Sequence, residues 1–230
     1  MTNDNSYSAH TVSQQNKSNS PTSKQKLEEF VYSPVIQKGD FLFHFTKDET
    51  LLQQYYKLRG DMYARELGLD DFPRTKDRFD DLSDILVLEK KGEVIGGVRI
   101  TMKKPHSDIL LPMESNDYNL NNLLPEMNLE NFVYGEFSRL AVLPGFRTEH
   151  VKTIIGMVGN KGRELSAKYL FAIAPSTQAR MYRKFEKYFG FTLEVRKDLG
   201  QSQVAKKWGL NMPLLIFRED TSSGDAEKTG

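Results

Sequence analysis

Apolar and polar positions alternate with two different periods in the first half of the chain. The segment DFLFHFT, residues 40–46, has the composition of a β-strand. Apolar residues then recur at helical spacing between residues 50 and 68, namely Leu51, Leu52, Tyr55, Leu58, Met62 and Leu67. Thr46 with Glu49 predicts a capping box at the start of this helix, and Gly68 predicts its end. The next run, DILVLEKKGEVIGGVRITM, predicts two strands joined by a hairpin at KKGE.

The second half of the chain repeats a pattern of strand and helix. NFVYGEFSRLAVLP and YLFAIAP predict strands, and TEHVKTIIGMVGNKGRELSAK between them predicts an amphipathic helix. STQARMYRKFEKYFG predicts a second helix that begins with Ser176 as its cap and stops at Gly190, and FTLEV and MPLLIF predict the last strands. A strand, a helix and a continuously apolar strand indicate a parallel or mixed sheet that helices cover.

One folded domain is predicted between residues 27 and 219. Residues 1–26 and 220–230 lack the apolar residues needed for packing, so both are predicted to be disordered arms. Between residues 103 and 131 a polar, Asn- and Pro-containing excursion holds one short apolar island, DILLPME. Its length predicts a functional loop or a lid.

Composition excludes several classes of function. The chain has 32 Lys and Arg against 31 Asp and Glu, so no nucleic-acid partner is predicted. The absence of cysteine excludes disulfides, thiolate nucleophiles and cysteine-ligated metals, and it favours a cytoplasmic location. No apolar run approaches the ~20 residues that span a bilayer, so no transmembrane segment is expected. The acids around residues 77–84 match no calcium loop and have no histidine close by, so no metal site is predicted.

Charged residues stand inside one segment that otherwise has the composition of a buried strand. VYGEFSRLAV places Glu136, Ser138 and Arg139 among strand-forming residues, where an acid and a guanidinium are costly to bury without partners. On strict alternation Glu136 and Arg139 point to opposite faces, but a β-bulge between them would bring both to one face. These charges indicate either a structural ion pair of Glu136 with Arg139 or Arg99, or a reactive site.

The order of elements and four short blocks resemble a known family. A strand ending in SRLAVLP, a helix, an apolar strand and a helix closing on YFGFTLE resemble the second half of the GNAT acyltransferases. The blocks KLRGDMYAREL, DRFDD, GGVRIT and GEFSRLAV resemble those of the autoinducer (N-acyl-homoserine lactone) synthases and the related N-acyl amino acid synthases, over roughly residues 41–194. The resemblance implies an α+β fold, with a mixed sheet splayed at a central pair of parallel strands and helices on both faces.

The resemblance also implies an acyltransferase that moves an acyl chain from a thioester to an amine. Such a reaction needs a base for the ammonium proton and donors for the tetrahedral oxyanion. Glu136 is the candidate base, directly or through a water, because an acid beside an apolar cleft has a raised pKa. Ser138 and Arg139 complete the candidate catalytic set.

Four further charged residues match the acceptor side of the family pattern. By the resemblance Asp77 and Asp80 are its paired acids, and they would form an anionic lip that attracts an ammonium group. Arg99 matches the strand arginine and Arg59 the helix arginine, so both belong to the acceptor-binding set. Arg99 would either hold Asp77 or Asp80 in place or bind a substrate carboxylate with two hydrogen bonds. The alternatives are solvated acids at a helix start, a structural salt bridge of Arg99, and a surface position of Arg59.

The donor side is predicted from residues that follow Arg139. By the resemblance, the acyl thioester would be held by Leu140, Ala141, Val142, Arg147 and Lys152. An acyl carrier protein or CoA would bring the acyl group as a co-substrate, with no bound cofactor. Basic residues between 147 and 168 would meet the pantetheine phosphate and an acidic carrier protein; a solvated basic helix is the alternative.

Departures from the family pattern favour one product over another. Thr75 stands where lactone synthases have an acid, and Leu69 where a tryptophan is expected. RTEHVK has His150 and Lys152 where acetyl-CoA enzymes carry glycines. We therefore predict transfer of a medium or long chain to an amine such as an amino acid. The alternatives are an N-acyl-homoserine lactone synthase using S-adenosylmethionine, an acetyl-CoA acetyltransferase, and a non-catalytic module that binds a thioester or an amine.

Overall fold

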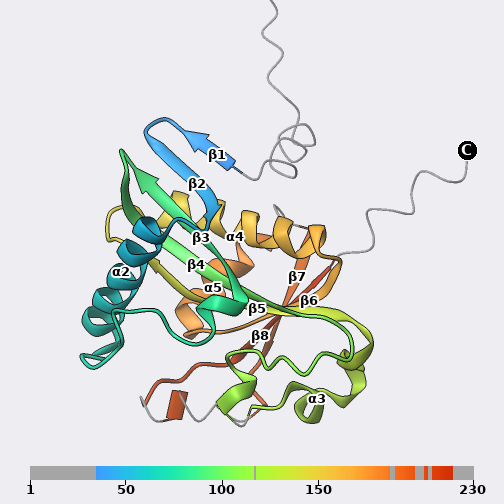
Figure 1. Cartoon of the computed structure of the whole chain (residues 1–230). Coiled ribbons are helices and arrows are strands. Elements are labelled where there is room, and N and C mark those ends of the chain that lie inside the picture. Colours follow the sequence, from blue (N-terminus) through green and yellow to red (C-terminus); the bar gives the residue numbers. More distant parts are fainter. Residues whose placement is uncertain (1–34, 117, 187–189, 200–204, 207–208, 220–230) are drawn as a thin grey trace, which may run out of the picture.

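The computed structural model describes residues 35–116, 118–186, 190–199, 205–206 and 209–219 (Figure 1). The two predicted arms and residues 27–34 of the predicted domain lie outside these ranges, so the disorder of the arms and the domain boundaries stay predictions. The strands and helices, in chain order, are β1 Val35–Lys38, β2 Phe41–Thr46, α2 Glu49–Leu67, β3 Ser83–Lys90, β4 Glu93–Lys103, α3 Leu120–Leu123, β5 Val133–Val142, α4 Arg147–Glu164, β6 Ala167–Ile173, α5 Ser176–Arg183, β7 Phe191–Arg196 and β8 Leu214–Glu219.

The strands form one mixed sheet in the order β1-β2-β3-β4-β5-β6-β8-β7. Every described pair of neighbours is antiparallel except β5 and β6, which run parallel at the centre. Pairing between them ends at Glu136 and Phe171, although β5 continues to Val142 and β6 to Ile173. The predicted fold class, a mixed sheet splayed at a central parallel pair, is therefore confirmed.

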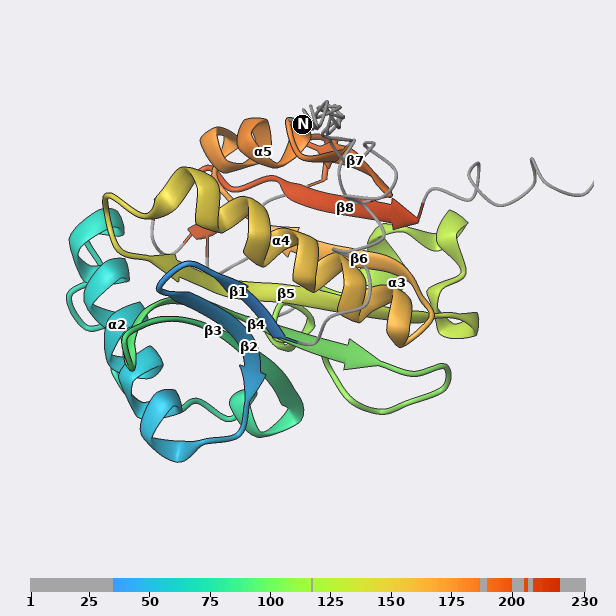
Figure 2. The ribbon, with the colours of Figure 1, turned by 90° about the horizontal axis from the view of Figure 1, so that it is seen from above.

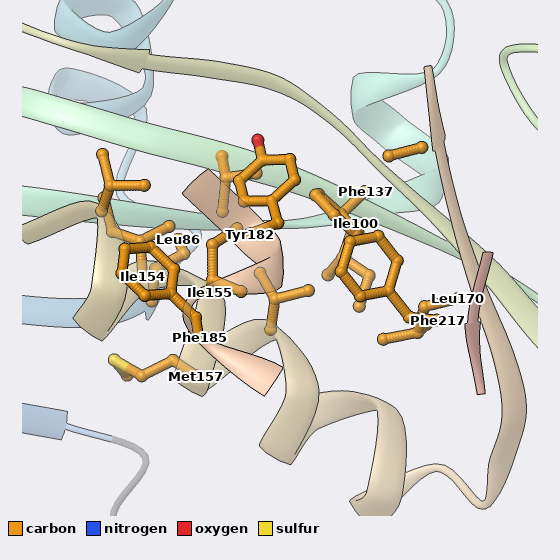
Figure 3. Close-up of a cluster of buried hydrophobic side chains, with 14 of the residues drawn as sticks. Leu86, Ile100, Phe137, Ile154, Ile155, Met157, Leu170, Tyr182, Phe185 and Phe217 are labelled. Atoms are coloured by element: carbon orange, nitrogen blue, oxygen red, sulfur yellow. The ribbon is translucent and has the colours of Figure 1, made fainter. Parts of the chain in front are cut away.

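Helices cover both faces of the sheet (Figures 1 and 2). Helix α2 packs on one face through a cluster that includes Leu52, Tyr55 and Met62, against β3 and β4. Helices α4 and α5 lie on the other face, where Figure 3 shows Ile154 and Ile155 of α4 among Phe137, Tyr182 and other buried side chains. Burial of these apolar faces supplies the main driving force for the layered arrangement.

The excursion between β4 and β5 builds a small core of its own. It contains α3 and three short 3₁₀ turns, and its apolar residues pack with Tyr134 and Phe171 of the sheet. The sequence predicted a loop or a lid here. The apolar island and the leucines that follow give the segment enough buried surface to pack against β5, β6 and β8, and its functional role stays a prediction.

Two helix caps expected from the sequence are corrected by the structure. The cap of α2 is Asp48, whose side chain accepts a hydrogen bond from the Leu51 amide; Thr46 instead accepts one from the amide of Asp48, so there is no Thr46 capping box. Gly68 ends this helix in the left-handed conformation, as expected. Helix α5 includes Ser176 as its first residue rather than its cap, and it ends at Arg183. Glu186 is helical again, and residues 187–189 lie outside the described residues, so the stop at Gly190 stays a prediction. Strand β1 was not predicted.

Candidate active site

A bulge in β5 turns two charged side chains to one face of the sheet. In the β4–β5 register Arg99 pairs with Ser138 and Gly97 with Ala141, so β5 carries one extra residue between these pairs. Arg139 takes up this residue with a φ of 61°, in the left-handed region. Its guanidinium consequently lies over the ring of Phe72 and near Asp77, on the side that Glu136 also faces. The bulge that the sequence analysis considered as one possibility is thus present.

A tyrosine from α2 stabilises this bulge. The Tyr55 hydroxyl donates a hydrogen bond of 2.7 Å to the carbonyl oxygen of Arg139, and burial raises the pKa of Tyr55. The ring reaches that carbonyl by lying against Gly97, where a Cβ atom would stand 2.7 Å from the tyrosine ring and 2.6 Å from the Leu86 carbonyl. Gly97 therefore permits a close approach by α2, and the sequence alone could not identify the approaching group.

Glu136 is buried at the point where β5 and β6 separate. The residue is 5% exposed, and its Oε2 accepts a hydrogen bond of 2.7 Å from the Met113 amide. Burial raises the pKa of Glu136 to about 7, against the opposing effects of the Met113 amide and of Arg99 and Arg139. A carboxyl group with such a pKa can hold or release a proton near neutral pH.

A cavity of about 400 Å³ opens beside Glu136. Of the residues predicted from the sequence, it is lined by Arg99, Glu136, Ser138, Arg139, Leu140, Ala141 and Val142. The structure adds residues that the sequence analysis missed, among them Met62 and Tyr63 of α2, Met113 of the excursion, and Met181 and Tyr182 of α5. No local pattern marks these residues, because apolar side chains at helical spacing usually belong to a core.

The acceptor-side residues form one ion-pair cluster. Arg59 binds Asp80 with two hydrogen bonds, of 2.8 and 2.7 Å, and Arg99 contacts Asp77 at 2.6 Å and Asp80 at 3.1 Å. Arg139 approaches Asp77 at 3.5 Å. Although burial alone would raise it, the pKa of Asp80 is lowered by the hydrogen bond and charge of Arg59. Each carboxylate is thus held by at least two guanidinium groups.

Only one of the four predicted acceptor-side residues lines the cavity. Arg99 lines the cavity, whereas Arg59, Asp77 and Asp80 are not among its lining residues. Asp77 and Asp80 are neutralised by arginines, so they do not form the anionic lip expected from the sequence. Arg59 is buried, at 1% exposure, rather than a surface residue. Whether any of the four binds the acceptor stays a prediction.

Three of the five predicted donor-side residues line the cavity. Leu140, Ala141 and Val142 line the cavity along the part of β5 that no longer pairs with β6. Arg147 is the first residue of α4, and its side chain lies outside the described part of the structure. Lys152 lies in the second turn of α4 and is not among the cavity-lining residues.

Glu136 is expected to make the free energy of unfolding depend on pH. Folding raises the pKa of Glu136 from 4.5 to about 7, so the protonated carboxyl contributes to the stability of the folded protein. This contribution is complete below about pH 4.5 and is lost as pH rises through 7. Relative to Glu136→Gln, the unchanged protein should lose about 2–3 kcal/mol of stability between about pH 5 and about pH 8.5. Urea unfolding of both proteins at both pH values measures this. If the difference in free energy of unfolding between the two proteins is the same at both pH values, the pKa of Glu136 is not raised by folding.

The splayed mixed sheet with a cavity at the splay is a GNAT-like fold. The sequence model of the family described as N-acyl amino acid synthase FeeM matches residues 54–194, more than half of the chain. The chain therefore belongs to this family.

Solved structures with similar folds include members of two synthase groups. The AHL synthase LasI has a TM-score of 0.52 and 16% identity, over 77% of this chain and 89% of that one. FeeM, an N-acyl amino acid synthase from uncultured soil microbes, has a TM-score of 0.52 and 13% identity, over 78% and 90%. BjaI, a CoA-dependent acyl-homoserine lactone synthase solved with SAM and isopentyl-CoA, has a TM-score of 0.50 and 16% identity, over 76% and 79%. No curated protein matches the chain in sequence. Among the helices that the structure describes, none is long and apolar enough to cross a membrane.

Proposed function

We propose that this enzyme transfers a medium or long acyl chain from an acyl thioester, carried by an acyl carrier protein or CoA, to the amino group of an amino acid. The observation that carries the proposal is Glu136, a buried carboxyl with a pKa of about 7, on the wall of a cavity at the splay of β5 and β6. Family membership supports the same reaction class.

Glu136 would serve as the base for the acceptor. Above pH 7 its carboxylate takes a proton from the substrate ammonium group, directly or through a water. The neutral amine then attacks the thioester carbonyl carbon, and a tetrahedral oxyanion forms. Collapse of this intermediate breaks the carbon–sulfur bond, so that the thioester and the ammonium yield an amide, a free thiol and one proton. Ser138 and Arg139 lie on the same wall as candidate donors to the oxyanion.

Unpaired guanidinium atoms favour an acceptor that carries a carboxylate. The cluster described above contains three arginines and two aspartates, which leaves one positive charge in excess. Within the described residues, Arg99 Nη2 and Arg139 Nε are buried without a hydrogen-bond partner, and both residues line the cavity. Buried donors of this kind are costly unless a ligand satisfies them, and guanidinium groups bind carboxylates with good geometry. An α-amino acid presents its carboxylate next to the amine that Glu136 would deprotonate.

Apolar walls favour a chain longer than acetyl. Val151, Ala172, Met181 and Met212 line the cavity beyond the charged residues. Each methylene group buried there contributes about 0.8 kcal/mol, or roughly a fourfold gain in affinity. Activity should therefore rise with chain length until the cavity is filled, whereas an acetyl-CoA enzyme would prefer the shortest donor.

A matrix of donors and acceptors tests the proposal. Thioesters from acetyl to palmitoyl, on CoA and on acyl carrier protein, are combined with amino acids, with their decarboxylated amines and with S-adenosylmethionine. Thiol release is followed by a thiol reagent, to which this cysteine-free protein adds no background, and products are identified by mass spectrometry. We expect N-acyl amino acids from the longer donors and little product from the decarboxylated amines.

Other outcomes of the matrix would contradict defined parts of the proposal. Equal transfer to an amino acid and to its decarboxylated amine would refute carboxylate recognition by Arg99 and Arg139. A lactone formed from S-adenosylmethionine would replace the proposed acceptor. If no donor releases thiol with any acceptor, the proposed function is wrong.

A further inference from the structure

A second buried carboxylate, Glu114, closes the backbone turn that contacts Glu136. Glu114 is 8% exposed, and its Oε2 accepts a hydrogen bond of 3.0 Å from the Leu111 amide. The same turn is closed by the Ser115 amide, which donates to the Leu111 carbonyl oxygen at 3.1 Å, and by the Ser115 hydroxyl, which donates to the Pro112 carbonyl at 2.8 Å. Residues 111–115 therefore form a compact turn around the Glu114 side chain.

Two residues of the sheet, one on β4 and one on β5, hold the Glu114 carboxylate. Lys103 Nζ lies 3.2 Å from Glu114 Oε2, and the Tyr134 hydroxyl donates to Oε1 at 3.2 Å. Lys103 and Tyr134 face each other across β4 and β5, and the pair two residues along the same strands is Thr101 with Glu136. Because residues two apart on a strand share a face, the anchor of Glu114 and the side chain of Glu136 are neighbours on one face.

The turn contacts Glu136 through the backbone amide of Met113. Met113 N donates to Glu136 Oε2 at 2.7 Å, and Pro112 and Met113 both line the cavity. Glu114 itself is not a cavity-lining residue. It can reach the reacting atoms only by holding the backbone that carries the Met113 amide.

We propose that Glu114 is a positioning residue for Glu136, which it orients by fixing the turn at residues 111–115 so that the Met113 amide points at Glu136 Oε2. The inference rests on the proposed role of Glu136 as the base. It assigns a function to a turn of the excursion, the segment whose length predicted a functional loop or a lid.

Loss of this contact changes the ionisation of Glu136 in a defined direction. The groups that face Glu136 are Arg99 from β4, Arg139 and Ser138 from its own strand, and the Met113 amide from the turn. The Lys103–Glu114 ion pair lies beside them on the same face of the sheet. The amide stabilises the carboxylate anion and lowers its pKa, against the raising effect of burial. Without the amide in place, Glu136 should titrate at a higher pH.

The test compares Glu114→Ala, which removes every acceptor atom of the side chain, with Glu114→Gln, which keeps an oxygen for the Leu111 amide. Glu130→Ala, an exposed glutamate of the same excursion, is the matched control. Both substitutions remove the Glu114 charge and leave Lys103 unpaired, which by itself lowers the pKa of Glu136, so the effect of the hydrogen bond is the difference between the two variants. The acid limb of the pH–rate profile should lie about one pH unit higher in the Ala variant than in the Gln variant. The Glu130→Ala control should keep the midpoint of the unchanged protein.

A second measurement does not depend on activity. The pH midpoint at which the protein and its Glu136→Gln variant diverge in stability is determined by urea unfolding, once with Glu114→Ala and once with Glu114→Gln. A higher midpoint with Glu114→Ala than with Glu114→Gln supports the proposal even if no acyl transfer has been found, so the two proposals can fail separately. If Glu114→Ala does not fold, Tyr134→Phe removes one bond to Glu114 and should shift the midpoint in the same direction. An equal loss of rate at every pH, with both midpoints unchanged, would overturn the proposal and leave Glu114 a purely structural residue.

Discussion

Replacement of Glu136 by glutamine is expected to lower the rate of acyl transfer by roughly 10²- to 10⁴-fold. Glutamine keeps the size of the side chain and an oxygen for the Met113 amide, which bonds Glu136 at 2.7 Å, but it cannot take a proton from an ammonium group. The variant should still bind the acyl thioester, since the apolar lining of the cavity is unchanged. Steady-state kinetics with the best donor measures the loss, and thioester binding by the variant is followed by calorimetry.

The matched control for this variant is Glu89→Gln, the same chemical change in another buried glutamate. Glu89 pairs with His44 and is not among the residues that line the cavity. Its replacement should leave the rate within a few fold of the unchanged protein. Full activity of Glu136→Gln would contradict the role of Glu136 as a base, whereas equal losses in both variants would indicate a general effect of removing buried charge.

Replacement of Asp80 by asparagine is expected to lower the free energy of unfolding by about 3–5 kcal/mol. Asp80 is fully buried at its side chain and accepts hydrogen bonds from Arg59, from Arg99 and from the Asp77 amide. Asparagine loses the charge that compensates the two buried guanidinium groups, and one of its two acceptor positions becomes a donor that faces other donors. Chemical unfolding near neutral pH measures the change.

Asp81→Asn is the matched control for this substitution. Asp81 is the next residue in sequence, but its side chain is exposed and pairs with the exposed Lys76. An exposed pair of this kind contributes little to stability, so the control should unfold close to the unchanged protein. If Asp80→Asn were equally harmless, the cluster would not hold the fold together, and its arginines would be free to serve substrate binding alone.

Most of the secondary structure could be predicted from the sequence because its periodicities are strong. The helix with Leu52, Tyr55 and Met62 on one side, the hairpin at KKGE and the apolar strand YLFAIAP all appear where the pattern places them. Caps were predicted less well, because Asp48 and Thr46 both have side chains that can accept a hydrogen bond from a backbone amide. The choice between such neighbours depends on the path of the chain into the helix.

Some residues of the candidate site could be predicted from the sequence, and others could not. Glu136 and Arg139 stand out because charge inside a strand is costly, and the bulge that unites them follows from the same observation. Arg99 was one of the partners considered for Asp77 and Asp80, and it contacts both. The pairing of Arg59 and Arg139 with these acids could not be derived, since a loop acid pairs with whichever arginines the fold brings near it. The same limit applies to Met113 and Glu114, whose contacts with β4 and β5 depend on how the excursion packs.

By itself the sequence determined the order of strands and helices, the absence of cysteine chemistry and the presence of charges in a buried strand. These properties are local, because they depend on residue type and on spacing along the chain. Only the tertiary structure decided that three arginines neutralise two aspartates, that Tyr55 crosses Gly97 to hold the bulge, and that a cavity opens where β5 and β6 separate. Each of these contacts joins residues far apart in sequence, and their geometry is set by the packing of the helices and the excursion on the sheet.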